Sequence, residues 1–438
     1  MSDPVNNGVK PAAPGGRRAW LCIGLPIAAV QVAYAAWRAL SVPPSADLVC
    51  FHRTCLYWWR TGAFTDALGV RQYLPAFVVL AAPFLAWPLW LVAPAWAILN
   101  ITLLMLTVRH VSRIAAGPDA AKMPDGLYWA WPIVLVLPFA SSTITQGQVN
   151  IVVLWLCVTA YVAAMRGRDT AAGLLIAVAG IVKIYPVLFI LYWLVKRRFR
   201  PAVTAGAACL GGAAILSLCG FGWRGSLEAH RIWLGQLCGI ESAQVHRGSS
   251  APATPGNIPF SEARNEYHRY NNQSLAVVVR RLTTSLYPAG DPRRVNLLDL
   301  SPRASAWLYG ASAGGLLVGL AVLAWRRRDR CDFEEWAAWL AAVIAFVPIY
   351  WTHYFVLALP VLTIMSFRVW QGRQTGRPEH AATILQACWL VALVLLAVPA
   401  AREVGVHCWI VLAATLWVVL RPGSMPAPAF AAVSVRGR

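Results

Sequence analysis

Long apolar runs, separated by short polar segments, follow one another along almost the whole chain. A helix needs about 20 apolar residues to cross a bilayer, and a span must satisfy its backbone hydrogen bonds internally. Runs of this kind lie at 19–40, 74–108, 128–143, 149–165, 171–195, 202–219, 304–325, 336–350, 354–370, 384–400 and 406–421. The pattern predicts an all-α polytopic membrane protein, a transmembrane helix bundle of about twelve spans with short helices in its extracytoplasmic loops.

Two of these runs leave the topology open. The run 74–108 is about twice as long as one span requires and is broken by Pro83, Pro88 and Pro94, whereas 171–195 has the length of one span but is interrupted by Lys183 and Pro186. In one arrangement, 171–195 turns back near Lys183 as two half-spans, and 74–108 holds an outer helix followed by one span. In the other arrangement, 74–108 holds two spans and 171–195 holds one.

The distribution of positive charge favours the first arrangement, because cytoplasmic loops of membrane proteins carry an excess of Lys and Arg. The most basic short loops are 194–201, 324–330 and 372–377. If these loops are cytoplasmic, two half-spans also place the basic segments 109–113 and 166–169 inside the cell. Lys183 and the polar segment 146–150 then face the outside.

Composition supports a membrane protein and argues against a nucleic-acid-binding protein. Of the 438 residues, 58% are hydrophobic and only 13% are charged, a balance typical of membrane proteins rather than soluble domains. The formal net charge of +20 would suit a nucleic-acid partner. The basic residues are concentrated in short loops, however, where topology already accounts for them. We therefore expect membrane lipids and no nucleic acid as partners.

The sequence predicts one membrane domain flanked by two tails. Residues 1–18 and 422–438 are rich in small and polar residues and in proline, which predicts disordered cytoplasmic tails. The first apolar run has no convincing signal-peptide cleavage site, so we expect an uncleaved first span. A single transmembrane domain then covers 19–421, with large extracytoplasmic loops at 41–73 and 220–303.

The sequence indicates no metal or cofactor. The ten cysteines show no C-x-x-C pair and no metal-ligand spacing. The chain has no phosphate-binding glycine loop of the Walker type, and its outer loops have no D-x-D pair that could hold a metal on a phosphate. Cys50 and Cys55 share the first outer loop, and an extracytoplasmic position would allow them to form a disulfide.

Asp47 is the candidate catalytic base. It follows the first span closely, in a loop rich in aromatic residues that also contains His52. A carboxylate there can take the proton of an attacking hydroxyl group. The alternative is a helix N-cap, because Asp is a preferred capping residue and the next residues have a helical composition. Asp66 is the other carboxylate of this loop.

Lys183, His353 and Arg280 are candidate ligands for a phosphate. Lys183 lies in the middle of an apolar run, too far from either end to extend its ammonium group easily into water. His353 lies at the outer junction between two spans, and histidine is not a usual residue of the aromatic belt. Arg280 belongs to a short amphipathic segment that is expected to lie on the membrane surface.

Neutral amides and one tyrosine are candidate contacts for a sugar or an acceptor. An amide both donates and accepts hydrogen bonds, as recognition of a molecule with many hydroxyl groups requires. These candidates are Gln146, Gln148, Asn150, Asn272, Gln273 and Tyr354. The alternative is that the amides serve as loop turns and caps, and that the tyrosine belongs to an aromatic belt.

Taken together, these residues resemble glycosyltransferase family 87, polytopic enzymes of the GT-C superfamily. Its members include mycobacterial polyprenyl-phosphomannose-dependent mannosyltransferases and arabinofuranosyltransferases. The matching segments are TQGQVNIVVLWL (145–156), GIVKIYPVLFIL (180–191), NNQSL (271–275) and WTHY…LP (351–360). Asp47 matches the acidic residue of the first outer loop, whereas RQYLPAF has one proline where the family often has Tyr-Pro-Pro.

The resemblance implies a GT-C-type bundle and an inverting membrane glycosyltransferase that uses no nucleotide sugar. Such an enzyme moves a hexose, mannose first of all, or a pentose from a polyprenyl-phosphate donor to a lipid or glycan acceptor. The expected place is the outer face of the plasma (inner) membrane. Asp47 would be the general base, and Lys183, His353 and Arg280 would bind the donor phosphate.

A multi-span transporter or a flippase of a lipid-linked saccharide is the alternative function. Broken helices and a lysine at mid-membrane are compatible with transport. The two halves of the sequence show no internal repeat, however, and the polar residues gather at one face instead of being spread through several spans. The pattern therefore favours the transferase.

Overall fold

The computed structural model describes residues 15–41, 47–64, 73–117, 122–238, 272–285, 294–347 and 350–420. These parts of the chain are helical, and their only strand-like pairing is an isolated bridge between Asn272 and Trp351. The predicted all-α membrane architecture is therefore confirmed.

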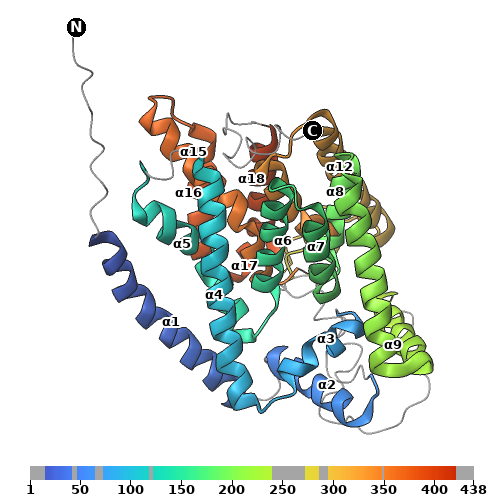
Figure 1. Cartoon of the computed structure of the whole chain (residues 1–438). Helices are drawn as coiled ribbons and strands as arrows, with labels where there is room; N and C mark the ends of the chain where they lie inside the picture. The colour runs from blue at the N-terminus through green and yellow to red at the C-terminus, as the bar shows by residue number, and fades with distance from the viewer. Residues whose placement is uncertain are drawn as a thin grey trace.

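The helices of the described residues are drawn in Figure 1, which labels most of them. They are α1 (Gly15–Ser41), α2 (Asp47–Thr61), α3 (Pro75–Leu85), α4 (Leu89–Ala116), η2 (Gly126–Ala130), α5 (Trp131–Gln146), α6 (Asn150–Met165), α7 (Asp169–Val182), η3 (Tyr185–Val187), α8 (Leu188–Val195), α9 (Phe199–Cys238), α11 (Leu275–Thr283), α12 (Pro302–Arg326), α13 (Phe333–Ala341), α14 (Val343–Phe346), η6 (Thr352–Ala358), α15 (Leu359–Gln374), α16 (His380–Leu395), α17 (Pro399–Val404) and α18 (Val406–Leu420).

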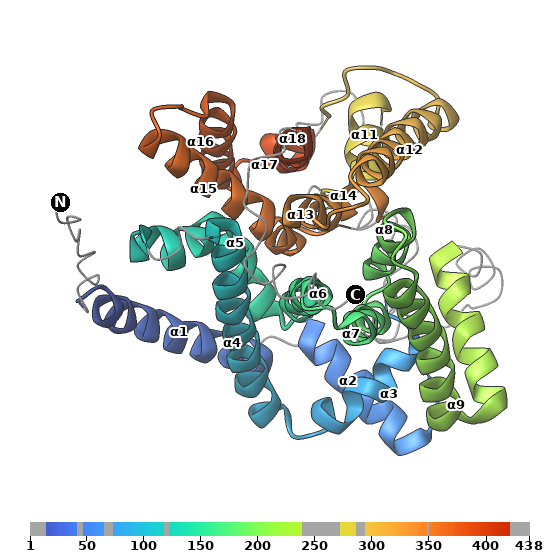
Figure 2. The same ribbon diagram turned by 45° about the horizontal axis from the view of Figure 1, so that its top comes forward.

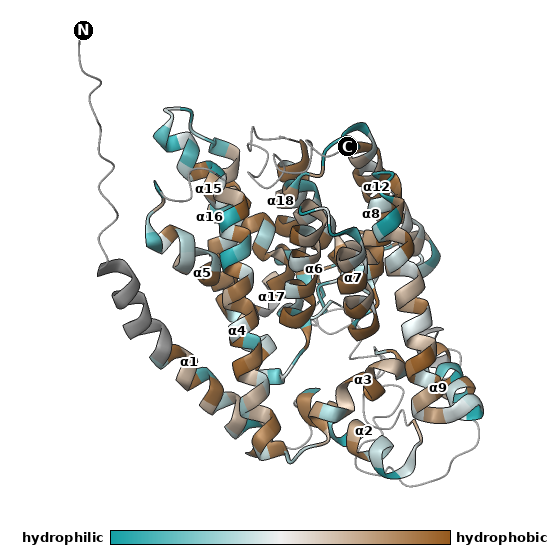
Figure 3. Cartoon of the chain, viewed as in Figure 1, coloured by the Kyte–Doolittle hydropathy of each residue, from teal (hydrophilic) through white to brown (hydrophobic). Residues whose placement is uncertain are grey.

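Within the described chain, five helical segments are long and apolar enough to cross a bilayer. They are 89–116, 126–146, 199–234, 302–326 and 352–374, and six shorter apolar helices accompany them. Hydrophobic residues dominate these helices, while hydrophilic residues gather towards the two ends of the bundle (Figure 3). The total of about twelve spans stays a prediction.

Helices α6 and α7 lie in the middle of the bundle (Figure 2). Helix α4 packs against α6 on one side of this pair, and α9 packs against α7 on the other, with α8 packed against α9. The core between them is built from apolar side chains, which gain free energy by leaving water or lipid for a densely packed interior.

The run 171–195 turns back on itself. Lys183 takes an extended conformation that ends α7, and Pro186 begins a new short helix, because proline is tolerated in the first turn of a helix but not in its interior. Beyond α8, Arg198 pairs with Asp169 at the start of α7, and its Nη2 donates a 3.0 Å hydrogen bond to the Ala164 carbonyl. Both ends of this segment therefore lie together, and the prediction of two half-length helices is confirmed.

The run 74–108 also divides as the first arrangement predicts. The short helix α3 is separated from α4 by a break at 86–88, and α4 alone has the length of a span. Helix α3 packs against α2 and α9, and Figure 1 shows α2 and α3 below the central helices. A short helix followed by one long helix therefore replaces the alternative of two spans.

Basic residues from distant segments meet at one end of the bundle, which we call the basic end (Arg113, Arg166, Arg198, Arg327 and Arg368). Arg113 and Arg166 line one small cavity. Lys196 donates to the carbonyls of Arg327 and Arg330 at 2.8 and 2.9 Å and pairs with buried Glu335. The basic segments 109–113, 166–169 and 194–201 therefore lie on one side of the bundle, as the positive charge predicts.

Parts of both large loops meet at the opposite end, which we call the site end (Asp47, Gln148 and Lys183). Helix α9 bends at Gly222, whose φ of 67° suits glycine, and just before this bend Trp58 Nε1 of α2 donates a 2.9 Å bond to the Gly220 carbonyl. Cys50 and Cys55 of α2 form no disulfide with each other. Asp66, most of 239–293 and both predicted tails lie outside the described residues, apart from the start of α1.

The two ends of the bundle can be distinguished by labelling. In a cysteine-free background we expect an impermeant maleimide to label Gln146→Cys and Arg168→Cys from opposite sides of the membrane. Gln146 ends α5 at the site end, whereas exposed Arg168 precedes α7 at the basic end. Labelling of Arg168→Cys from outside the cell would contradict the half-length hairpin.

Candidate active site

Asp47 begins α2 at the point where this helix contacts the turn between α5 and α6. The buried face of α2 carries Leu48, Val49, Phe51, Thr54 and Cys55, so the helix turns one apolar stripe towards the bundle. A carboxylate at the start of a helix is stabilised by the positive end of the helix dipole. The fold thus holds Asp47 at the edge of the core, next to the polar segment 146–150.

Gly147 makes the close contact between α2 and α5 possible. It ends α5 in the left-handed conformation, with a φ of 71°, which glycine adopts without strain. A Cβ atom at this position would lie 2.3 Å from Cβ of Leu48. The absence of a side chain therefore lets the turn approach α2 closely enough for Gln148 to reach Asp47.

Gln148 connects Asp47 to Tyr73. Its Nε2 donates a hydrogen bond to Asp47 Oδ2, and its Oε1 accepts a 3.0 Å hydrogen bond from the hydroxyl of Tyr73. Gln148 and Tyr73 are both buried. The amide predicted as a sugar contact therefore uses its two described hydrogen bonds on the candidate base and on Tyr73.

Lys183 reaches the same site from the end of α7. Its Nζ donates a 2.9 Å hydrogen bond to Asn150 Oδ1 and lies 3.7 Å from the ring centroid of Tyr354 and 5.4 Å from that of Tyr73. Among the described residues no carboxylate forms an ion pair with it within 4.0 Å. The ammonium group is held by an amide and by cation–π contacts, and it keeps donors for a ligand.

Several buried polar atoms of the described residues near Lys183 have no hydrogen-bond partner. They are Nδ2 of Asn150, the hydroxyl of Tyr185 and Nε2 of His353. His353 is oriented by Thr143, whose Oγ1 donates a 3.0 Å bond to the His353 carbonyl, and its ring lies beside that of Tyr354. Unsatisfied buried donors are costly, so this set is suited to a ligand with several acceptor oxygens.

The protonation of Asp47 depends on opposing influences. Burial raises the pKa of the Asp47 carboxyl above its ordinary value, because it disfavours the charged form. The hydrogen bond from Gln148 and the charges of Lys183 and Arg38 act against this rise. A carboxyl with a raised pKa is a stronger base than an exposed aspartate, which suits removal of a proton from a hydroxyl group.

The remaining predicted residues lie apart from the carboxylate. Gln146 Nε2 bonds to Ser142 Oγ at 2.8 Å. Asn272 Oδ1 accepts from the Tyr350 and Ser274 amides at 2.9 and 3.2 Å, and Gln273 Nε2 donates to the Arg402 carbonyl at 2.7 Å. These bonds hold the segment at 272–274 against Tyr350 and Trp351, just before His353.

A buried ion pair supports this segment. Arg281 pairs with Glu403 at 3.1 Å, and its Nη2 donates a 2.9 Å bond to the Asn272 carbonyl. The neighbouring Arg280 is half-buried, and its Nε has no hydrogen-bond partner among the described residues. The structure therefore brings Asp47, Gln148, Asn150, Lys183, His353 and Tyr354 together, whereas the phosphate role of Arg280 and the sugar roles of the amides stay predictions.

Tyr73 and Tyr185 were missed by the search for polar residues, although each lies in a noticed motif. Tyr73 belongs to RQYLPAF and Tyr185 to GIVKIYPVLFIL, each followed closely by a proline. Within the described ranges, no group of three or more His, Cys, Asp or Glu side chains could hold a metal ion. A metal-independent reaction stays a prediction.

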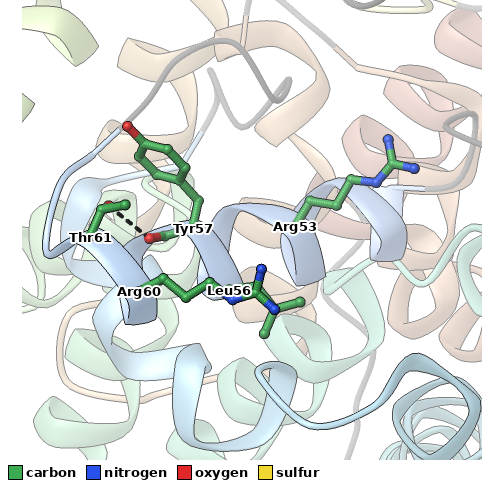
Figure 4. Close-up of a pocket in the computed structure, with 5 residues that line it drawn as sticks. All are labelled: Arg53, Leu56, Tyr57, Arg60 and Thr61. Atoms are coloured by element: carbon green, nitrogen blue, oxygen red, sulfur yellow. Dashed lines mark hydrogen bonds between the residues drawn. The ribbon is translucent and has the colours of Figure 1, made fainter.

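A surface cavity of about 310 Å³ lies on the outer side of α2 and is lined by Arg53, Leu56, Tyr57, Arg60 and Thr61. Figure 4 shows these side chains, with the Thr61 hydroxyl donating to the Tyr57 carbonyl at 2.8 Å. None of them belongs to the buried face of α2. This cavity is therefore separate from the cluster around Asp47.

Comparison with known proteins identifies the family. The sequence model of glycosyltransferase family 87 matches residues 72–360. A polyprenol-phosphate-mannose-dependent alpha-(1-2)-phosphatidylinositol mannoside mannosyltransferase of Mycobacterium tuberculosis is 26% identical over 392 residues, which is 82% of this chain and 79% of the relative. A protein of the same description from Mycolicibacterium smegmatis is 26% identical over 443 residues, or 93% and 87% of the two chains.

Among solved structures, ArnT from Cupriavidus metallidurans bound to undecaprenyl phosphate aligns with 92% of this chain and 77% of its own. The TM-score is 0.37 and the sequence identity is 14%. A likeness of this size carries no inference about the activity of the present chain.

Gly147 offers a test of the contact between α2 and the α5–α6 turn. We expect Gly147→Ala to lower the melting temperature and the catalytic rate, because strain at positive φ costs about 1–2 kcal/mol and overpacking against Leu48 adds about 1–3 kcal/mol. Gly62→Ala is the matched control, since Gly62 also has a positive φ, 68°, but has open space around its Cβ position. Equal effects of the two variants on the rate would contradict a role for the close contact.

Proposed function

The chain belongs to glycosyltransferase family 87, and from this we propose that it is an inverting enzyme that transfers mannose from a polyprenyl-phosphate donor to a lipid acceptor. The names of the mycobacterial relatives support the donor, since both are described as polyprenol-phosphate-mannose-dependent. They also support a glycolipid acceptor of the phosphatidylinositol mannoside type. Membership of this family replaces the alternative of a transporter or flippase.

The observation that carries the mechanism is the placement, at the same end of the bundle, of one carboxylate and one ammonium group that has no ion-pair partner among the described residues. Asp47 and Lys183 come from elements 136 positions apart (183 − 47), and the charge of Lys183 acts on the Asp47 carboxyl. The carboxylate of Asp47 suits the removal of a proton, and the ammonium group of Lys183 suits the binding of a phosphate.

We assign the steps as follows. The acceptor hydroxyl oxygen attacks C1 of the mannosyl group on the face opposite the phosphate, and the bond between C1 and the phosphate oxygen breaks. The hydroxyl proton passes to Asp47, and the bonding electrons leave with the polyprenyl phosphate. Lys183 Nζ and His353 Nε2 stabilise the negative charge that grows on this leaving group.

We also propose that the site end faces the outside of the plasma membrane. The basic end carries arginines from several distant segments, and positive loops are retained in the cytoplasm. The prenyl chain of the donor would lie between the apolar helices next to Asp47 and Lys183, and the acceptor would approach at the depth of the lipid headgroups.

The role of Asp47 can be tested by Asp47→Asn, which keeps the size and most of the capping ability but cannot accept the proton. Removal of a general base costs about 10²–10⁴-fold in rate, whereas loss of a cap costs only about 1 kcal/mol of stability. We expect near-total loss of mannose transfer from polyprenyl-phosphate mannose, with melting temperature and donor binding nearly intact. Retention of more than about a tenth of the rate would favour the capping role and move the search for the base to Asp66.

The role of Lys183 can be tested against a matched buried lysine. Lys183→Met should weaken binding of undecaprenyl phosphate about 10-fold or more and leave the melting temperature equal or higher, because it removes the cost of burying an ammonium group that has no carboxylate within ion-pair distance among the described residues. Lys196→Met should lower the melting temperature, since it leaves Glu335 buried and unpaired, at a cost of about 3–5 kcal/mol. Unchanged affinity of Lys183→Met, measured as protection from thermal unfolding, would exclude Lys183 as a phosphate ligand.

A further inference from the structure

While Asp47 is ionised, the hydrogen-bonded chain Tyr73–Gln148–Asp47 runs in one direction. Because the Tyr73 hydroxyl donates to Gln148 Oε1, the amide must present Nε2 to the carboxylate. If the amide were reversed, its Oε1 would face an ionised carboxylate, and two acceptors would oppose each other. Donation from the Tyr73 hydroxyl to Oε1 therefore supports the amide orientation that stabilises the charged form of Asp47.

The ring of Tyr73 is held by the same helix that carries the base. Phe51, one helical turn after Asp47, packs edge-on against Tyr73 with ring centroids 4.8 Å apart, and Phe77 of α3 packs against the same ring at 4.8 Å. The hydroxyl is thus aimed at Gln148 by aromatic contacts from α2 and α3. Gly147 fixes the other end of the chain, since it brings Gln148 up to Leu48.

We propose that Tyr73 and Gln148 are positioning residues that keep Asp47 ionised and aimed at the acceptor hydroxyl. This inference rests on the proposed role of Asp47 as the base. It assigns Gln148 to the base instead of the sugar, and it gives Tyr73 a role in the reaction without contact to the reacting atoms.

The groups that face Asp47 come from several elements. Lys183 at the end of α7 and Arg38 of α1 are the positive ones. Cys50 of α2, Tyr73 before α3 and Tyr354 of η6 also interact with its charge. The two cations favour the carboxylate, burial opposes it, and the amide of Gln148 is the described hydrogen-bond donor that acts on it directly.

Loss of this donor should move the ionisation of Asp47 to higher pH. A hydrogen bond to a charged group changes the pKa of that group by about one to two. We therefore expect Gln148→Leu to move the acid limb of the kcat profile upwards by about this amount, and Tyr73→Phe, which removes only the hydroxyl that supports the amide, to move it in the same direction by less. At a pH above the shifted limb, the rate of Tyr73→Phe should return close to that of the wild type.

The matched control is Tyr161→Phe. Tyr161 is also buried and its hydroxyl also donates one described bond, to the Cys331 carbonyl at 3.0 Å, but it lies at the basic end. Loss of the Tyr161 hydroxyl should lower the melting temperature without moving the acid limb of the kcat profile. The assay uses polyprenyl-phosphate mannose and a phosphatidylinositol mannoside, with kcat and KM measured separately across pH.

A second measurement needs no turnover. Because the pKa of Asp47 is raised in the folded protein, the folded state binds more protons than the unfolded state between the two pKa values. The melting temperature of the wild type, relative to Asp47→Asn, should therefore fall as pH rises through this window and then become level. In the Tyr73→Phe and Gln148→Leu backgrounds, the fall should continue to higher pH.

The outcomes separate the two proposals. An active Asp47→Asn variant would overturn the base assignment, while the thermal titration would still report on the hydrogen-bonded chain. An inactive Asp47→Asn variant, together with unshifted rate and melting profiles in both Tyr73→Phe and Gln148→Leu, would overturn the positioning role alone. A shift of the same size in Tyr161→Phe would also overturn it.

Discussion

The cost of a buried charge is the constraint on which the rest of this structure depends. A charged group removed from water needs a partner, and the bundle meets this requirement differently at its two ends. At the basic end, Lys196 is paired with Glu335 and with two carbonyl groups. At the site end, Lys183 donates a hydrogen bond to one amide and lies over two aromatic rings. Because no carboxylate of the described residues forms an ion pair with Lys183, this end is suitable for an anionic ligand.

Close backbone contacts hold that charge at a defined site. The break after Lys183 stops α7 at half the length of a span, and Gly147 lets α2 approach the α5–α6 turn. The carboxylate of Asp47 is then buried next to an amide instead of being exposed on a loop. Burial strengthens the carboxyl as a base, but it also favours the neutral acid, so the site needs a donor that opposes protonation.

The sequence predicts the backbone of this arrangement better than its side-chain pairings. A lysine and a proline inside one apolar run predicted the turn at Lys183, because neither residue suits the middle of a span. The partner of Gln148, by contrast, is 101 residues away and that of Asn272 is 78 residues away. An amide accepts many partners, and only the folded chain decides between a sugar, a backbone group and a carboxylate. Tyr73 was missed for the same reason, since a tyrosine among apolar residues shows no chemistry until its hydroxyl has a neighbour.

An amide also suits a base that must change its charge in every turnover. Once Asp47 has taken the acceptor's proton, the neutral acid has a donor of its own, and the amide orientation that stabilised the carboxylate is no longer required. A half-rotation of Gln148 would let Oε1 accept from the new Asp47 hydroxyl, while Nε2 donates to the oxygen of Tyr73, because a phenol both donates and accepts. A fixed cation in place of Gln148 would hold the carboxylate ionised too strongly for it to take the proton. A neutral donor–acceptor chain therefore fits a general base better than a second lysine would.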